Sequence, residues 1–153
     1  MSITFSKCKG PLPPERLAQA EATMGVTFPA PYREFMLEHN GGEPSKRDFV
    51  FAEATGPYTD GRLRKFYPIE DAAALSLEWK HKLFCGSEPP RIPRDMIPIA
   101  GDSFGNQICI GISGPRCGQI YFWDHEKEDA DEPTYGNMHL LARSFSEFLA
   151  KLT

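Results

Sequence analysis

The chain has 153 residues, which suits one domain with its own core, so we expect a single domain over residues 1–153. Lys and Arg total 17 and Asp and Glu total 21, a net charge of −4. This balance gives no overall basic field for nucleic acid, whereas a mildly acidic surface favours a basic protein partner. The sequence offers neither a membrane-length apolar run nor a signal-peptide core, and four cysteines are too few for a disulfide scaffold. We therefore expect a cytoplasmic protein with reduced thiols and no membrane contact.

The first forty residues predict two helices. A proline pair opens the first, because proline is tolerated at a helix start, and Gly25 ends it. Its apolar face consists of Leu17, Ala20 and Met24. The second helix runs from Phe28-Pro29 to the stop at Asn40-Gly41-Gly42, and its apolar face consists of Tyr32, Phe35, Met36 and His39.

The middle of the chain predicts a strand, a loop and a third helix. The strand is Phe49-Val50-Phe51, and turn signals at Gly56-Pro57 and Asp60-Gly61 predict a loop over residues 52–66. A helix is expected over residues 71–84, with a buried face made of Ala72, Leu75, Trp79 and Leu83. We expect Trp79 and Trp123 to be core anchors, although an exposed tryptophan would be a binding hot spot.

Residues 96–124 predict an antiparallel meander of three strands, at 96–100, 107–112 and 120–123. Pro98 indicates an edge or a bulge, since proline cannot donate to a ladder. Apolar residues alternate with others over 107–112, which predicts one buried face. We expect Cys109 to lie opposite Phe122 or Trp123, and not opposite Cys117.

The C-terminal part predicts a polar stretch over 124–136, a strand over 138–141 and a final helix. Ser144 and Glu147 have capping-box spacing, and an apolar face follows them. Helices at both chain ends around a run of strands predict the fold class α+β, with an antiparallel multi-stranded sheet flanked by helices.

Five landmarks occur in an order that resembles a known family. They are Phe28-Pro29 with Tyr32-x-x-Phe35-Met36, the Asn40-Gly41-Gly42 stop, Ile97-Pro98-Ile99-Ala100 with Gly105-Asn106, the segment from Gly118 to Glu126, and Phe145-x-x-Phe148-Leu149. Together they resemble the SUKH superfamily, in the branch similar to the fungal cell-wall assembly regulator (Smi/Knr-like). Residues 52–95 match little of this pattern.

The resemblance implies a SUKH-like antiparallel sheet flanked by helices. Bacterial members are largely immunity proteins, which bind and neutralise polymorphic toxins of interbacterial competition systems, and many of those toxins are nucleases. Fungal members act as regulatory scaffolds and usually carry extra disordered arms. This sequence shows no such arms, which favours the immunity function and leaves a regulatory scaffold without a toxin partner as the alternative.

Catalytic and metal sites are weakly indicated. Asp124-His125-Glu126 with His139 would offer metal ligands, but strand alternation sends Asp124 and His125 to opposite sides, as at a solvated strand end. Cys109 or Cys117 with a histidine would suit a small hydrolase, but a cysteine in an apolar strand behaves as a small hydrophobic residue. We expect no catalytic residue, no cofactor and no metal.

The segment from Asp124 to Glu132, named here the acidic segment, holds six acidic residues among nine. Such charge runs are commonly solvated loops. The functional interpretation is a patch that complements the basic cleft of a toxin, speeds association and covers the cleft. The expected contact residues are Asp124, Glu126, Glu128, Asp129, Asp131 and Glu132.

Overall fold

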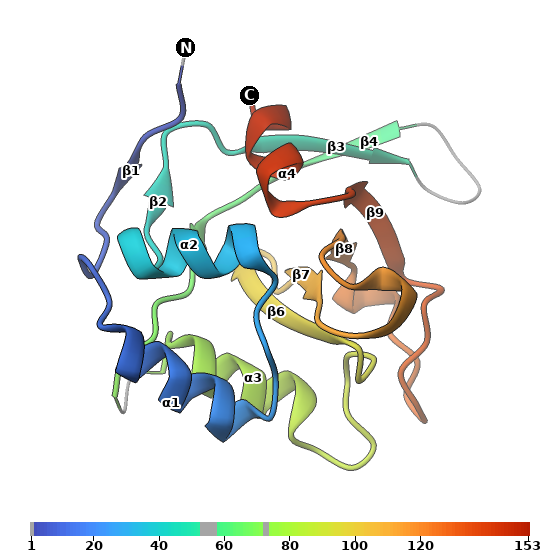
Figure 1. Ribbon diagram of the computed structural model, residues 1–153. Helices are drawn as coiled ribbons and strands as arrows, with labels where there is room; N and C mark the ends of the chain where they lie inside the picture. The colour runs from blue at the N-terminus through green and yellow to red at the C-terminus, as the bar shows by residue number, and fades with distance from the viewer. Residues whose placement is uncertain (1, 53–57, 72–73) are drawn as a thin grey trace.

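The protein is described by a computed structural model, which covers residues 2–52, 58–71 and 74–153 (Figure 1). Helices lie near both chain ends around antiparallel strands, so the predicted α+β class is confirmed. In chain order the elements are β1 (Phe5–Ser6), α1 (Pro14–Met24), α2 (Ala30–Glu38), β2 (Glu43–Pro44), β3 (Asp48–Ala52), β4 (Tyr58–Arg62), β5 (Lys65–Phe66), α3 (Leu77–Cys85), β6 (Met96–Gly101), β7 (Gln107–Gly111), η1 (Gly114–Arg116), β8 (Ile120–Trp123), η2 (His125–Lys127), β9 (Met138–Ala142) and α4 (Phe145–Lys151).

The central element is a five-stranded antiparallel sheet in the order β5-β6-β7-β8-β9, which confirms the predicted meander. Two short ribbons, β1–β2 and β3–β4, complete the strands. β6 lies between β5 and β7, and its register to β7 shifts between Pro98 and Ala100. Pro98 therefore marks a bulge in an interior strand rather than an edge.

The pairing of β7 with β8 differs from the prediction by one residue. Cys109 lies opposite Tyr121, not Phe122 or Trp123. The connection contains the 3₁₀ turn η1, and Gly111 donates to the carbonyl of Gln119 at 2.9 Å. This compact turn sets the register, and the sequence alone did not give its length. Cys117 follows η1 in the connection, so it does not face Cys109 across the hairpin, as expected.

Both faces of the sheet are buried, so the expectation of one buried face for residues 107–111 is wrong. One face packs on a large core beneath α1, α2, α4 and β3. The other face packs on a smaller core, beneath the end of α3 and the chain after it, made of Phe84, Ile92, Met96, Cys109, Trp123 and Met138. Gln107 is a buried polar residue of β7, and its side-chain oxygen is satisfied by the Tyr67 hydroxyl, which donates to it at 2.6 Å.

The helix pair α1–α2 and the final helix confirm their predictions. The buried residues of α1 are Leu17, Ala20 and Met24, and Gly25 ends it at φ +70°. α2 is followed by Asn40, at φ +52°. The cap of α4 is the hydroxyl of Ser144, which accepts from the Glu147 N–H at 3.1 Å.

The predicted loop over 52–66 is wrong for two stretches, since β4 and β5 form there. Asp60-Gly61 belongs to β4, and Gly61 pairs with Phe49 of β3. A Cβ on Gly61 would lie 2.5 Å from the Phe49 ring, so this glycine makes room for the ring rather than for a turn. The signal at Gly56-Pro57 lies outside the described residues.

The third helix is shorter than predicted, and the face that it buries differs from the predicted one. It begins at Leu77, because the hydroxyl of Ser76 accepts from the Trp79 N–H and caps it. Its buried residues are Leu77 and Phe84. Leu75, Trp79 and Leu83 of the predicted buried face are 44%, 44% and 40% exposed, and Ala72 lies outside the described residues. Trp123 is fully buried, so only one of the two tryptophans is a core anchor.

Candidate functional site

The acidic segment starts at a fixed point on the end of β8. The Asp124 carboxylate accepts from the Glu126 N–H at 3.0 Å and so caps η2. The backbone N–H of Asp124 donates to the Asn137 carbonyl at 3.0 Å, and the Asn137 side chain donates to the Asp124 carbonyl at 2.9 Å. The Asn106 side chain contacts both the backbone and the ring of His125, at 3.0 and 2.6 Å. Asp124 is therefore part of the scaffold.

Glu128 is a second fixed point. Its carboxylate accepts from the Arg91 guanidinium at 2.9 and 3.3 Å. The same guanidinium lies over the rings of Phe84 and Trp123, at 4.7 and 5.6 Å from their centroids. Glu128 is thereby tied to the smaller core, and its charge is balanced by Arg91.

The other four predicted contact residues, Glu126, Asp129, Asp131 and Glu132, are exposed. The Asp129 carboxylate accepts from the N–H groups of Asp131 and Glu132, at 2.8 and 3.2 Å. These backbone bonds lower the pKa of Asp129, because they stabilise its charged form. The six predicted residues thus divide into two that anchor the segment and four that present negative charge to solvent.

A second surface, which sequence reasoning missed, lies on α3. We call it the α3 face and define it by the residues lining a hollow of about 400 Å³: Trp79, Lys82, Leu83, Gly86 and Ser87. Its apolar side chains are exposed because α3 buries Leu77 and Phe84 instead. The sequence signal that could have been used is the cap at Ser76, which sets where the helix begins and leaves Leu75 outside it.

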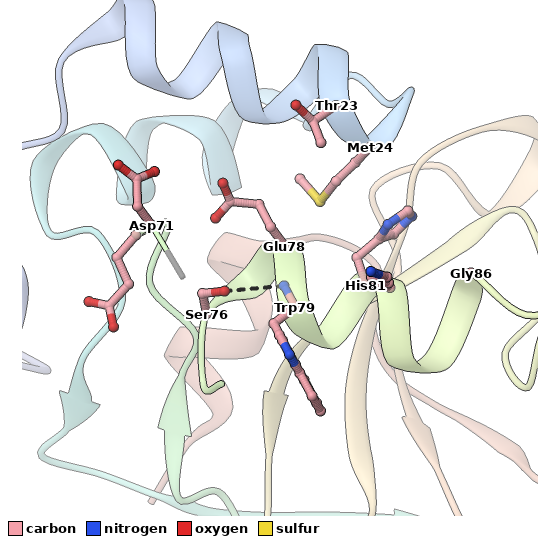
Figure 2. Close-up of a pocket in the computed structure, with 10 residues that line it drawn as sticks. Thr23, Met24, Asp71, Ser76, Glu78, Trp79, His81 and Gly86 are labelled. Atoms are coloured by element: carbon pink, nitrogen blue, oxygen red, sulfur yellow. Dashed lines mark hydrogen bonds between the residues drawn. The ribbon is translucent and has the colours of Figure 1, made fainter. Parts of the chain in front are cut away.

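Another hollow, of about 420 Å³, lies between α1 and α3 (Figure 2). Figure 2 shows Glu78 and His81 directed from α3 toward α1, with the Trp79 indole directed away from α1. Glu78 shares the Arg16 guanidinium with Asp71, at 2.6 and 2.8 Å. Burial lowers the pKa of His81. The Arg16–Glu78 ion pair therefore joins α1 to α3 beside this hollow.

The geometry of the described residues gives little support to a metal site or to a catalytic cysteine. Among residues 2–52, 58–71 and 74–153, no group of three or more His, Cys, Asp or Glu is placed to hold a metal ion. His139 of β9 packs against the ring of Phe51, with 5.2 Å between the ring centroids. Cys109 is fully buried, and burial raises its thiol pKa, which disfavours a nucleophilic thiolate.

Comparison with known proteins finds that residues 11–151 match the SMI1 / KNR4 family (SUKH-1). The chain belongs to this family. The match extends from the residue before Leu12 to the end of α4, so the acidic segment and the α3 face both lie within it.

Two relatives come from Bacillus subtilis (strain 168). The SPbeta prophage-derived uncharacterized protein YokK is 44% identical over 147 residues, covering 90% of this chain and 73% of that protein. The uncharacterized protein YnaB is 49% identical over 35 residues, covering 23% of this chain and 24% of that protein.

Among the described residues of this SUKH-1 member, none of the helices has both the length and the apolar character that a membrane-spanning segment needs.

Proposed function

We propose that this SUKH-1 member is a non-catalytic immunity protein, which binds and neutralises a basic toxin protein of an interbacterial competition system. Membership in the SMI1/KNR4 family supports this class of function. The observation that carries the proposal is the acidic segment, which is fixed at Asp124 and Glu128 and exposes four carboxylates, one between these points and three just after Glu128.

The physical basis is electrostatic complementarity. A toxin that cleaves nucleic acid holds a polyanion, so its cleft is basic. Glu126, Asp129, Asp131 and Glu132 place negative charge on one short stretch, where it attracts such a cleft and speeds association. Because Asp124 and Glu128 are anchored, the segment is partly ordered before binding, which lowers the entropy lost on association.

The test is co-expression with the C-terminal domain of the secreted protein encoded nearest to this chain's gene. We expect a stable complex at low salt, a weaker one at high salt, and rescue of growth from the toxicity of that domain. Absence of both complex and rescue would contradict the immunity function and leave a regulatory scaffold as the remaining candidate.

Two sets of variants separate a local patch from overall charge. The first neutralises Glu126, Asp129, Asp131 and Glu132 to Gln or Asn. The matched set neutralises four exposed carboxylates elsewhere, at Glu15, Glu34, Glu38 and Asp60. Both sets remove four negative charges, so a slower association confined to the first set supports the acidic segment, and equal rates argue against it.

A further inference from the structure

The α3 face is apolar where the rest of the helix surface is polar. Trp79 and Leu83 are 44% and 40% exposed, and they border a hollow of about 400 Å³. Large aromatic side chains at the surface are the residues that most often dominate the energy of a protein interface. A hollow beside such a side chain gives a partner's apolar group a place to enter.

The α3 face is also rigidly held. The backbone N–H of Leu77 donates to the Pro68 carbonyl at 2.7 Å, and Leu77 is fully buried in the larger core. At the other end, Phe84 packs on Trp123 in the smaller core, with 5.5 Å between ring centroids. Both ends of the helix are thus fixed, so little conformational entropy is lost when a partner covers the face.

The chain after α3 joins the α3 face to the acidic segment. Gly86 and Ser87 line the hollow on the α3 face. A few residues later, Pro89, Pro90 and Arg91 border a second hollow of about 390 Å³, whose opposite wall is residues 128–132. In Figure 1 the chain after α3 and the chain after β8 accordingly lie on the same side of the molecule.

Charge decides which partner fits this combined surface. The acidic segment offers exposed carboxylates at Glu126, Asp129, Asp131 and Glu132, whereas the combined surface carries two lysines, Lys82 on the α3 face and Lys127 in the acidic segment. A complementary partner is therefore basic around a central apolar contact, which matches the arrangement of a polar rim around an apolar interface core.

We propose that the α3 face is the apolar anchor of the interface with the basic toxin, and that the acidic segment is its charged rim. This inference rests on the proposed function and assigns it a surface. Trp79 enters a pocket of the toxin, an apolar toxin side chain enters the hollow beside Leu83, and the acidic segment meets basic residues around them.

The first test compares Trp79→Ala and Leu83→Ala with two control variants, Phe104→Ala and Leu140→Ala. The controls remove exposed apolar side chains, 78% and 48% exposed, from the β6–β7 turn and from β9. We expect Trp79→Ala to raise Kd for the toxin domain by at least about 30-fold, mainly through faster dissociation, with the controls changing Kd less than about threefold. Neutralising the acidic segment should instead slow association and reduce its salt dependence.

The second test needs no substitution, which guards against a variant that fails to fold. Labelling only this chain with 5-fluorotryptophan gives two fluorine signals, from half-exposed Trp79 and fully buried Trp123. On adding unlabelled toxin domain, we expect the Trp79 signal to shift and to lose its sensitivity to D2O, with the Trp123 signal unchanged. A Trp79 signal that stays solvent-sensitive in a formed complex would overturn the anchor while leaving the immunity function intact, and failure of the wild-type chain to bind would overturn both.

Discussion

Arg91 holds Glu128 against the smaller core of the protein. Its guanidinium donates to both carboxylate oxygens, at 2.9 and 3.3 Å, while the guanidinium carbon lies 4.7 Å from the Phe84 ring centroid. The end of α3 and the acidic segment are therefore joined through one side chain. Substitution of Arg91 should affect both surfaces of the proposed interface.

We predict that Arg91→Ala lowers the free energy of unfolding by about 1–2 kcal/mol, because it removes both the ion pair and the stacking on Phe84 and Trp123. Glu128→Gln should cost less, about 0.2–1 kcal/mol, since a partly exposed ion pair contributes little in water. Urea denaturation of each variant measures these differences.

Arg94→Ala is the matched control, because Arg94 pairs with Glu88 at 2.6 Å but both side chains are largely exposed. Its loss should change stability by less than about 0.5 kcal/mol. If Arg91→Ala were as mild as Arg94→Ala, the stacking on the smaller core would contribute nothing measurable.

Much of the fold follows from short-range patterns. The prolines, the terminal glycines and the spacing of Leu17, Ala20 and Met24 predicted α1 correctly, because the inward face and the helix ends are both encoded locally. The three strands of the meander were also predicted correctly, because their apolar runs and the turns between them are local features. β4 was missed, because Asp60-Gly61 is a common turn pair and only the ring of Phe49 across the ribbon explains the glycine.

The two proposed binding surfaces also differ in how far local sequence predicts them. The acidic segment is visible in the sequence. That Asp124 and Glu128 anchor it could not be predicted, because this depends on Asn137 and Arg91, which are distant along the chain. The α3 face was assigned to the core, because the spacing of Leu75, Trp79 and Leu83 satisfies a helical period as well as that of Leu77 and Phe84. Only the smaller core beneath Phe84 decides between them.

Asn40 joins α2 to the chain before α3. Its buried amide donates to the Ile69 carbonyl at 2.9 Å and accepts from the Ile69 N–H at 2.7 Å, at φ +52°. We predict that Asn40→Ala lowers the free energy of unfolding by about 3–5 kcal/mol, since two buried backbone groups lose their partner and alanine is strained at this φ.

Asn40→Gly separates the two contributions, because glycine adopts positive φ freely but also lacks the amide. It should be more stable than Asn40→Ala by about 1 kcal/mol and still less stable than the wild type. Equal stability of the two variants in urea denaturation would show that backbone strain plays no part at this position.

The four thiols should differ in reactivity by their burial. Cys117 is exposed, whereas burial raises the pKa of Cys85 to about 12 and also raises the pKa of Cys109 well above its ordinary value. We predict that iodoacetamide at pH 8 labels Cys117 first and leaves Cys85 and Cys109 intact until urea unfolds the chain. Mass spectrometry of peptides identifies each site, and rapid labelling of Cys109 would instead favour the small hydrolase.

Stability should fall at alkaline pH. Burial raises the folded-state pKa of Tyr32, Tyr67, Cys85 and Cys109 above their ordinary values of 10.0 and 9.0. Above pH 9 the unfolded chain releases these protons while the folded chain keeps them, so unfolding becomes more favourable as pH rises. We expect the urea midpoint to be steady near pH 8 and to decrease between pH 9 and 12, and a midpoint that rises over this range would contradict the burial of these groups.

The two buried tyrosines should respond to the loss of their hydroxyls in opposite directions. The Tyr32 hydroxyl is buried and has no hydrogen-bond partner among the described residues, whereas the Tyr67 hydroxyl donates to Gln107 at 2.6 Å. An unpaired buried hydroxyl is unfavourable, so Tyr32→Phe should raise the free energy of unfolding at pH 7 by up to about 1 kcal/mol. Tyr67→Phe should lower it by about 1–3 kcal/mol, because the Gln107 oxygen loses its donor inside the protein.

Each of these variants also removes one group whose raised pKa opposes folding at high pH, so both should show a flatter loss of stability above pH 9 than the wild type. The two variants therefore change stability in opposite directions at pH 7, whereas both gain stability relative to the wild type between pH 7 and pH 11. Parallel urea titrations at the two pH values measure both effects. A loss of stability in Tyr32→Phe at pH 7 would contradict this prediction, because it would show that the hydroxyl stabilises the core.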